Sequence, residues 1–172
     1  MILGLKRLLA VATLLALAAC GGSDDHPDPV NIVETAKADP QFSILVEAVV
    51  AADLATTLSG AGPFTVFAPT NTAFGALLAE LGVTKAELLA NKPLLTQVLT
   101  YHVLGSKVGR AAVPLGKPIT TLQGGYFKVD AAGSALVITD GRNRTATITA
   151  TDIVASNGVL HVVDKVLLPA DK

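Results

Sequence analysis

Residues 63–74 read Pro-Phe-Thr-Val-Phe-Ala-Pro-Thr-Asn-Thr-Ala-Phe, and residues 157–169 read Asn-Gly-Val-Leu-His-Val-Val-Asp-Lys-Val-Leu-Leu-Pro. The first stretch predicts a short strand that Pro69 closes, followed by a short helix that Thr70 or Asn71 caps. The second stretch predicts a tight turn at Asn-Gly followed by a strand over 159–167. Each stretch therefore joins an apolar strand to a defined turn or helix start.

Helix signals lie on both sides of the first stretch. They combine capping patterns, in which a polar residue is followed three positions later by glutamate, with apolar residues at helical spacing. Glycines end the second of these helices, and a proline stands in the first turn of the last, where it is tolerated. The predicted helices begin after Asn31, cover 42–58, begin after Thr84 with Glu87 as partner, and cover 92–101.

After residue 102 the pattern changes to strands that Gly-rich or polar turns separate. Asp140-Gly141 is one strong hairpin signal among them. Since helices come mostly first and strands mostly last, the order favours an α+β fold with an antiparallel sheet over an alternating parallel one. The predicted strands cover 119–122, 126–130, 135–139, 145–153 and 159–167.

The two quoted stretches resemble the two signature boxes of fasciclin domains. Between them, Leu99-Thr100-Tyr101-His102-Val103-Leu104 resembles the family's Tyr-His segment, and Ile32-Val33-Glu34 resembles its opening helix. The resemblance implies an α+β, fasciclin-like compact fold, with two small, mostly antiparallel β-sheets in a sandwich or wedge flanked by several α-helices. One departure is Ala73, where many members carry a glutamate that would strengthen a helix cap.

The resemblance also implies an extracellular role in adhesion or interaction. Family members bind integrins, matrix proteins and, in some cases, apolar pigments, so the family alone does not specify the ligand. In animal members, segments matching Tyr101-His102 and Asp152-Ile153 are assigned to adhesion. The alternative for Tyr101 and His102 is structural, a buried ring and a helix C-terminal cap. The alternative for Asp152 is turn bonding at a strand end.

The first residues have the pattern of a bacterial export signal. Lys6 and Arg7 precede an apolar run over 8–17 and then small residues, a run too short to span a bilayer. Leu17-Ala18-Ala19-Cys20 resembles the bacterial lipobox, which implies cleavage before Cys20 and its acylation with palmitate-like chains. The alternatives are a short membrane anchor or a core helix. Cys20 is also the only cysteine, so no disulfide is possible within the chain.

This reading divides the chain into a signal peptide over 1–19, a lipidated flexible linker over 20–29 and a fasciclin-like domain over 30–170. Removing 19 residues from 172 leaves 153, which suits one domain that we expect to be monomeric. The predicted location is the bacterial cell envelope. By the sorting rule of Gram-negative lipoproteins, Gly21 after the cysteine favours the outer membrane or the cell surface.

Composition argues against several classes of function. Without Lys6 and Arg7, 11 basic residues stand against 14 acidic ones, a net charge of −3 that does not suit nucleic-acid binding. Seven Phe and Tyr residues and no Trp argue against an aromatic platform, and a single cysteine argues against thiolate metal sites. We therefore expect neither a cofactor nor a bound metal.

Few residues suggest catalysis. The chain lacks a Gly-x-Ser-x-Gly elbow, and His102 and His161 lie 59 positions apart. On an alternating strand, Asp164 would share an apolar face and need a bonding partner, while His161 would lie on the wetter side. The Arg142-Asn143-Arg144 tip is either a solvated turn or a contact for anionic lipid or polysaccharide.

The sequence thus predicts a lipid-anchored envelope protein that displays one fasciclin domain for cell adhesion or for binding to proteins or extracellular matrix. Its partner is an unidentified surface protein, a matrix component or a polysaccharide. Three alternatives stay open: a carrier of an apolar small molecule such as a lipid or pigment, held between helices and sheet; an enzyme, which would require both histidines and a carboxylate in one cleft; and a purely structural envelope component.

Overall fold

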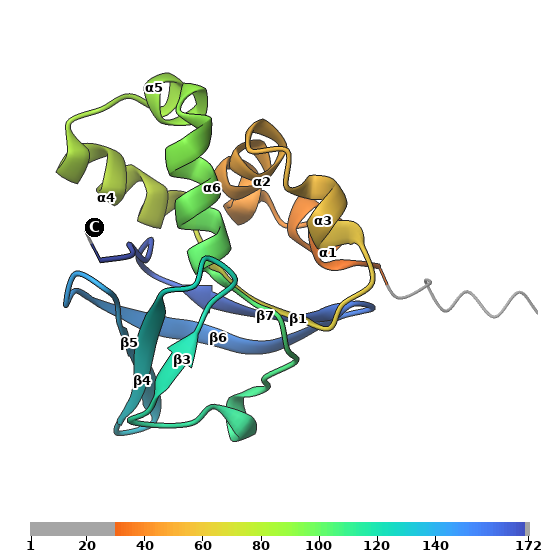
Figure 1. The fold of residues 1–172 in the computed structure, drawn as a ribbon, viewed down its shortest axis with the longest axis vertical. Coiled ribbons are helices and arrows are strands. Elements are labelled where there is room, and N and C mark those ends of the chain that lie inside the picture. Colours follow the sequence, from red (N-terminus) through yellow and green to blue (C-terminus); the bar gives the residue numbers. More distant parts are fainter. Residues whose placement is uncertain (1–29, 171–172) are drawn as a thin grey trace, which may run out of the picture.

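A computed structural model of the protein describes residues 30–170, in which helices dominate the first half and strands the second (Figure 1). The helices pack together on one side of a twisted sheet. The α-helices are α1 (Ile32–Lys37), α2 (Ser43–Ala51), α3 (Ala55–Ser59), α4 (Asn71–Leu81), α5 (Lys85–Ala90) and α6 (Lys92–Tyr101). The strands are β1 (Phe64–Pro69), β2 (Val103–Leu104), β3 (Pro118–Thr120), β4 (Tyr126–Ala132), β5 (Ala135–Thr139), β6 (Thr145–Ala155) and β7 (Gly158–Val163).

The helix caps follow the sequence patterns closely. The Asn31 side chain accepts the Glu34 N–H at the start of α1, and the Thr70 hydroxyl accepts the Ala73 N–H at the start of α4. At α5, Thr84 and Glu87 form a complete capping box. At α4 the third helical residue is alanine, so the reciprocal half of a capping box is missing there.

The single helix expected over 42–58 is wrong. A 3₁₀ turn (Pro40–Phe42) comes first, and α2 and α3 are separated where Asp53 adopts a left-handed backbone with φ of 58°. Aspartate tolerates this conformation better than most residues because its short polar side chain can bond locally. The apolar spacing continues across the break, which is why the sequence pattern alone does not reveal it.

The strands form one seven-stranded sheet in the order β2-β1-β7-β6-β5-β4-β3, which confirms the α+β class. All neighbouring pairs are antiparallel except β1 and β7, which run parallel. The expected division into two small sheets is replaced by a continuous ladder, because the eleven-residue β6 pairs with β5 at one end and with β7 along the rest. Register shifts between Ile148 and Ile153 bend it on the way.

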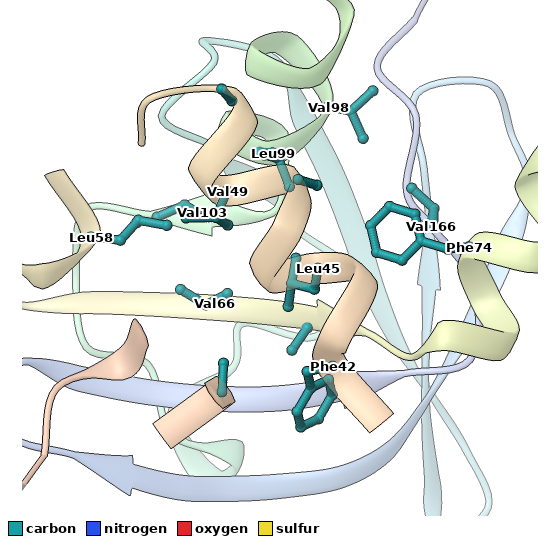
Figure 2. Packing of buried hydrophobic residues seen from close by; sticks show 14 of the residues in the cluster. Phe42, Leu45, Val49, Leu58, Val66, Phe74, Val98, Leu99, Val103 and Val166 are labelled. Atoms are coloured by element: carbon teal, nitrogen blue, oxygen red, sulfur yellow. The ribbon is translucent and has the colours of Figure 1, made fainter. Parts of the chain in front are cut away.

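The central strands β1 and β7 are buried on both faces. Val66 and Ala68 of β1 pack with the helices in one hydrophobic cluster, whereas Phe67 belongs to a second cluster with the antiparallel strands. Figure 2 shows the first cluster, where Leu45 of α2 and Val66 of β1 point into the same interior. This double burial explains why the second stretch reads as a nearly continuous apolar run.

The double burial corrects the expectation for His161. The sequence placed it on the wetter side of its strand, but every residue of β7 is buried and His161 is 0% exposed. The strand also ends at Val163, earlier than the predicted Leu167. Asp164 consequently lies beyond the strand and is exposed, and its carboxylate accepts the Thr147 N–H at 2.7 Å. Asp164 therefore has the hydrogen-bond partner that the sequence predicted, but it does not lie on an apolar face.

The Asn157 side chain joins the turn before β7 to α1 and to the end of α3. Its Oδ1 accepts the Ile32 N–H at 2.9 Å, and its Nδ2 donates to the carbonyls of Leu58 and Gly60, both at 2.8 Å. Beside it, a Cβ on Gly158 would lie 2.1 Å from the Phe64 carbonyl oxygen, so only glycine fits. The Asn-Gly pair thus fixes α1, α3 and β1 against the β6–β7 hairpin.

We expect Asn157→Ala to lower the free energy of unfolding by about 2–4 kcal/mol, because one donor and two acceptors lose their partner at once. Asn91→Ala is the matched control, since the Asn91 side chain makes a single cap bond to the Leu94 N–H. It should cost about 1 kcal/mol. Urea unfolding of both variants measures the difference, and equal losses would contradict the joining role of Asn157.

Candidate functional site

The candidate residues from the sequence fall into separate places. Cys20 lies outside the described residues. Tyr101 and His102 end α6 and are buried, at 0% and 1% exposure. Asp152 and Ile153 lie near the far end of β6, on a bulged stretch. The structure therefore does not bring the two pairs together. Of these four residues, only Asp152 has an exposed side chain.

His102 is held by two backbone groups. Its Nε2 accepts the Leu167 N–H at 2.9 Å, so the proton lies on Nδ1, which donates to the Val98 carbonyl at 2.7 Å. Burial lowers the pKa of His102 to about 4, outweighing the opposing effect of the Val98 carbonyl. The neutral ring thus links α6 to the segment after β7, a structural role for this half of the Tyr-His pair.

Tyr101 is held in a similar way on the other side of α6. Its hydroxyl donates to the Tyr126 carbonyl at 2.6 Å, and its ring meets Phe127 edge-on with centroids 6.0 Å apart. Burial raises the pKa of Tyr101 to about 12. Since both side chains face the interior, any effect of Tyr101 or His102 on binding would be indirect, through the surface that they support.

Residues 105–113, which we call the polar strap, are bonded to residues of β1, β7 and β6. The Thr65 hydroxyl donates to the Ser106 carbonyl and accepts the Val108 N–H, at 2.6 and 2.8 Å. His161 Nε2 donates to the Val108 carbonyl at 2.8 Å, while His161 Nδ1 accepts the Asp152 N–H at 3.3 Å. Buried polar side chains thus hold the strap, although the sequence marked Thr65 only as a strand residue.

Asp152 contributes the last attachment of the strap. Its backbone is left-handed, with φ of 59°, and its Oδ1 accepts the Arg110 N–H at 2.9 Å. The Arg110 guanidinium in turn donates to the Ser134 carbonyl at 2.6 Å. The expected turn-type bonding of Asp152 is therefore present, but it arises at a bulge inside β6. At this bulge Asp152 is exposed and Ile153 is half-buried.

In the Arg142–Arg144 tip, Arg142 and Asn143 are exposed, whereas the Arg144 side chain is bonded to other parts of the fold. Arg144 makes ion pairs with Glu80 of α4 at 2.8 Å and with Asp140 at 3.0 Å, and it donates to the Val166 carbonyl. Asp140 is only 5% exposed and accepts four donors, including the Leu168 N–H. Such a buried carboxylate needs these bonds, so the hairpin ties α4 to the C-terminal segment.

No catalytic constellation forms from the residues that were considered. Both ring nitrogens of His102 and of His161 are engaged with backbone groups. Between residues 30 and 170, no three His, Cys, Asp or Glu side chains are grouped so as to hold a metal ion. In the same range, no helix combines the length and the apolar character needed to cross a membrane.

A family model of the fasciclin domain matches residues 40–169. This chain belongs to the fasciclin domain family. The resemblance inferred from the two boxes and the Tyr-His segment is therefore confirmed.

Relatives of this fasciclin domain occur in bacteria and animals. Protein sll1483 of Synechocystis sp. is 46% identical over 145 residues, covering 81% of this chain and 74% of that protein. Human periostin is 32% identical, covering 84% of this chain and 17% of periostin. Transforming growth factor-beta-induced protein ig-h3 of Sus scrofa is 34% identical, covering 81% of this chain and 19% of that protein. The chain thus spans less than a fifth of these animal relatives.

Among solved structures, a FAS1 domain pair from the insect cell adhesion molecule fasciclin I matches with a TM-score of 0.46 and 22% identity. The match covers 78% of this chain and 43% of that chain.

The buried His102 predicts a pH dependence of stability. The native ring is neutral with a pKa of about 4, whereas the ring in the unfolded chain has the ordinary imidazole pKa of 6.5. The contribution of the neutral ring to the free energy of unfolding is complete above pH 6.5 and is lost as the pH falls toward 4. The loss amounts to about 3 kcal/mol, because each unit of pKa shift corresponds to about 1.4 kcal/mol. Urea unfolding at pH 7 and pH 4.5 should show a steeper loss for the wild type than for His102→Asn. Parallel losses in the two proteins would contradict this assignment.

Proposed function

We propose that this protein is a lipid-anchored envelope protein whose fasciclin domain binds a surface protein, a matrix component or a polysaccharide. The proposal rests mainly on the observation that the buried polar side chains are hydrogen-bonded within the fold. Across residues 30–170, no buried side-chain nitrogen or oxygen lacks a hydrogen-bond partner. Side chains that are already bonded within the fold are poorly placed to react with a ligand, which favours a function carried by surface residues. The adhesion role of animal members of the family also favours binding at the surface.

The anchor part of the proposal rests on the sequence before residue 30. A charged start, a short apolar run and small residues precede Cys20, the single cysteine of the chain. Acylation would use the thiol that otherwise has no disulfide partner. Several acyl chains together hold a protein on a membrane far more firmly than one, since each buried CH₂ contributes about 0.8 kcal/mol.

The bulge at Asp152 is the surface that we favour for the contact. Asp152 is exposed, Ile153 is half-buried, and Val154 next to them is 69% exposed. A carboxylate beside a large exposed apolar side chain can combine charge recognition with apolar burial. The strap and His161 hold the bulge from below, so the side chains are displayed on a supported backbone.

The anchor is tested by expressing the full chain and Cys20→Ala in a bacterial host. We expect the wild type to gain the mass of a diacylglyceryl group plus an acyl chain and to enter the detergent phase on partition. Cys20→Ala should lose both properties, because it lacks the acylated sulfur. Intact-mass spectrometry and phase partition measure the outcomes. A wild-type chain of unmodified mass that stays in the aqueous phase would contradict lipid anchoring.

The contact surface is tested by Asp152→Asn, which removes the charge yet keeps an oxygen that can accept the Arg110 N–H. Asparagine also tolerates the left-handed backbone. We expect domain-coated beads to bind cells or extracted polysaccharide about two- to fivefold more weakly, the range for one exposed charge pair. Asp130→Asn, an exposed aspartate on β4, is the matched control and should bind like the wild type. Equal binding by all three proteins would contradict a contact at this bulge.

A further inference from the structure

A cavity of about 420 Å³ lies at the end of the sheet where the pairing of β4 with β5 stops. The last paired residues are Lys128 of β4 and Thr139 of β5, although β4 begins earlier, at Tyr126. The ladder therefore ends before the strand does, and the cavity lies at this end of the two strands. Besides these three residues, its lining consists of Tyr101, Gly125, Asp140, Gly141, Asn143 and Ala170.

Three of the lining side chains share the outer face of the sheet. Tyr126 and Lys128 alternate with the buried Phe127 along β4, so both point away from the core. Thr139 lies directly opposite Lys128 and points the same way, because paired residues of neighbouring strands share a face. Tyr126 is 60% exposed, more than any other aromatic residue between residues 30 and 170. The cavity is therefore open to solvent on the face that carries these side chains.

Several polar groups of the lining are available to a ligand. Within residues 30–170, the Lys128 ammonium, the Thr139 hydroxyl and the Asn143 side-chain amide take part in no hydrogen bond or ion pair. The Asp140 carboxylate, in contrast, already accepts four donors. A ligand can therefore bond to Lys128, Thr139 and Asn143 without breaking any bond of the fold.

The size of the cavity limits what can occupy it. At roughly 30 Å³ for an atom the size of a water molecule, 420 Å³ holds about fourteen non-hydrogen atoms, and a hexose has about twelve. The cavity between α1, α2 and the sheet, where an apolar carrier site was considered from the sequence, has only about 30 Å³ and fits about one such atom. The larger cavity thus suits a single sugar ring.

We propose that this cavity, here called the Tyr126 site, binds one neutral hexose unit of a polysaccharide. A hexose ring has an apolar face of C–H groups, which can lie on the tyrosine ring, while its hydroxyls donate and accept hydrogen bonds. The ammonium of Lys128 donates, and the Thr139 hydroxyl and the Asn143 amide can do both. One aromatic ring is enough for one sugar unit, so the site does not require the extended aromatic platform that the composition argues against.

The charges of the lining favour a neutral sugar over an acidic one. Lys128 and Asp140 are its only charged residues, and their charges are opposite. An acidic sugar would gain attraction from the Lys128 ammonium but would also be repelled by the Asp140 carboxylate. A neutral hexose avoids this repulsion and still accepts a hydrogen bond from Lys128.

The position of the Tyr126 site suits a protein that is anchored through its N-terminus. Thr139 pairs with Thr145 at the start of β6, whereas Ser156, just after the end of β6, bonds to Val30 at the start of the domain. The eleven residues of β6 span up to about 35 Å. In Figure 1 the β5–β6 and β6–β7 turns accordingly lie at opposite ends of the sheet. The site therefore faces away from the predicted linker.

The probes are methyl glucoside, methyl galactoside and methyl mannoside, each with about thirteen non-hydrogen atoms and therefore within the size of the site. They are titrated into the full chain carrying Cys20→Ala, so that no acyl group or detergent competes. We expect at least one of them to bind saturably with a Kd of about 1–10 mM, as the size of the ligand allows. Amide chemical shifts should change at Tyr126, Lys128 and Asn143. Methyl glucuronoside, which is acidic, should bind no more tightly than methyl glucoside.

Two variants and a control locate the site. Tyr126→Ala removes the stacking ring and should weaken hexoside binding roughly tenfold. Asn143→Gly should weaken it about threefold, because glycine removes the amide but adopts the left-handed backbone of Asn143, with φ of 59°, without strain. Leu115→Ala is the matched control, since Leu115 is 48% exposed but lies outside the cavity, and it should stay within twofold of the unsubstituted chain. Unchanged spectra in the absence of ligand check that each variant folds.

Absence of saturation by all three hexosides, or equal weakening by Tyr126→Ala and Leu115→Ala, would overturn the site. Tighter binding of the glucuronoside than of the glucoside would overturn the neutral ligand. The Tyr126 site rests on the proposed function in taking a polysaccharide as the partner, but it shares no residue with the Asp152 bulge. Because the titrations depend on neither the anchor nor Asp152, their failure would leave the contact tested by Asp152→Asn intact, and the reverse also holds.

Discussion

The parallel pairing of β1 with β7 is the constraint on which the rest of the fold depends. Its two strands come from stretches more than 90 residues apart, and both are buried on both faces. Helices must cover one face, and the antiparallel strands with the strap must cover the other. Polar groups at this pair, such as Thr65 and His161, can persist only because strap atoms bond them. Removing any one covering element would expose apolar strands and leave buried polar groups without partners.

The signature segments of this fasciclin domain therefore act mainly in its construction. Asn157 joins two helices to the hairpin, His102 fastens α6 to the segment after β7, and Tyr101 fixes α6 to β4. Side chains used in this way are not available to a partner. It follows that differences in binding between proteins with the same fold would lie in surface positions such as the Asp152 bulge, outside the boxes by which the family is recognised.

Local signals in the sequence were sufficient for most of the elements but not for their assembly. The caps at Asn31 and Thr84 and the hairpin turn at Asp140-Gly141 depend on neighbouring residues, so pattern reasoning found them. The burial of His161 and the ion pair of Arg144 with Glu80 depend on contacts between distant segments. No periodicity encodes those contacts.

The proposed anchor and the proposed contact surface place opposite demands on the linker. The Ser156 N–H donates to the Val30 carbonyl, so the start of the domain lies beside the β6–β7 turn. Asp152 is four residues before that turn residue, about 13 Å along an extended strand. At that distance from the start of the domain, Asp152 lies beyond the Debye length of about 8 Å, so an anionic membrane would repel its carboxylate only if this face of the domain approached the membrane. If the ten residues of the predicted linker behave as a coil, their span is on the order of 20 Å, which would allow the face to stay away from the membrane. The predicted linker would therefore make the two proposals compatible.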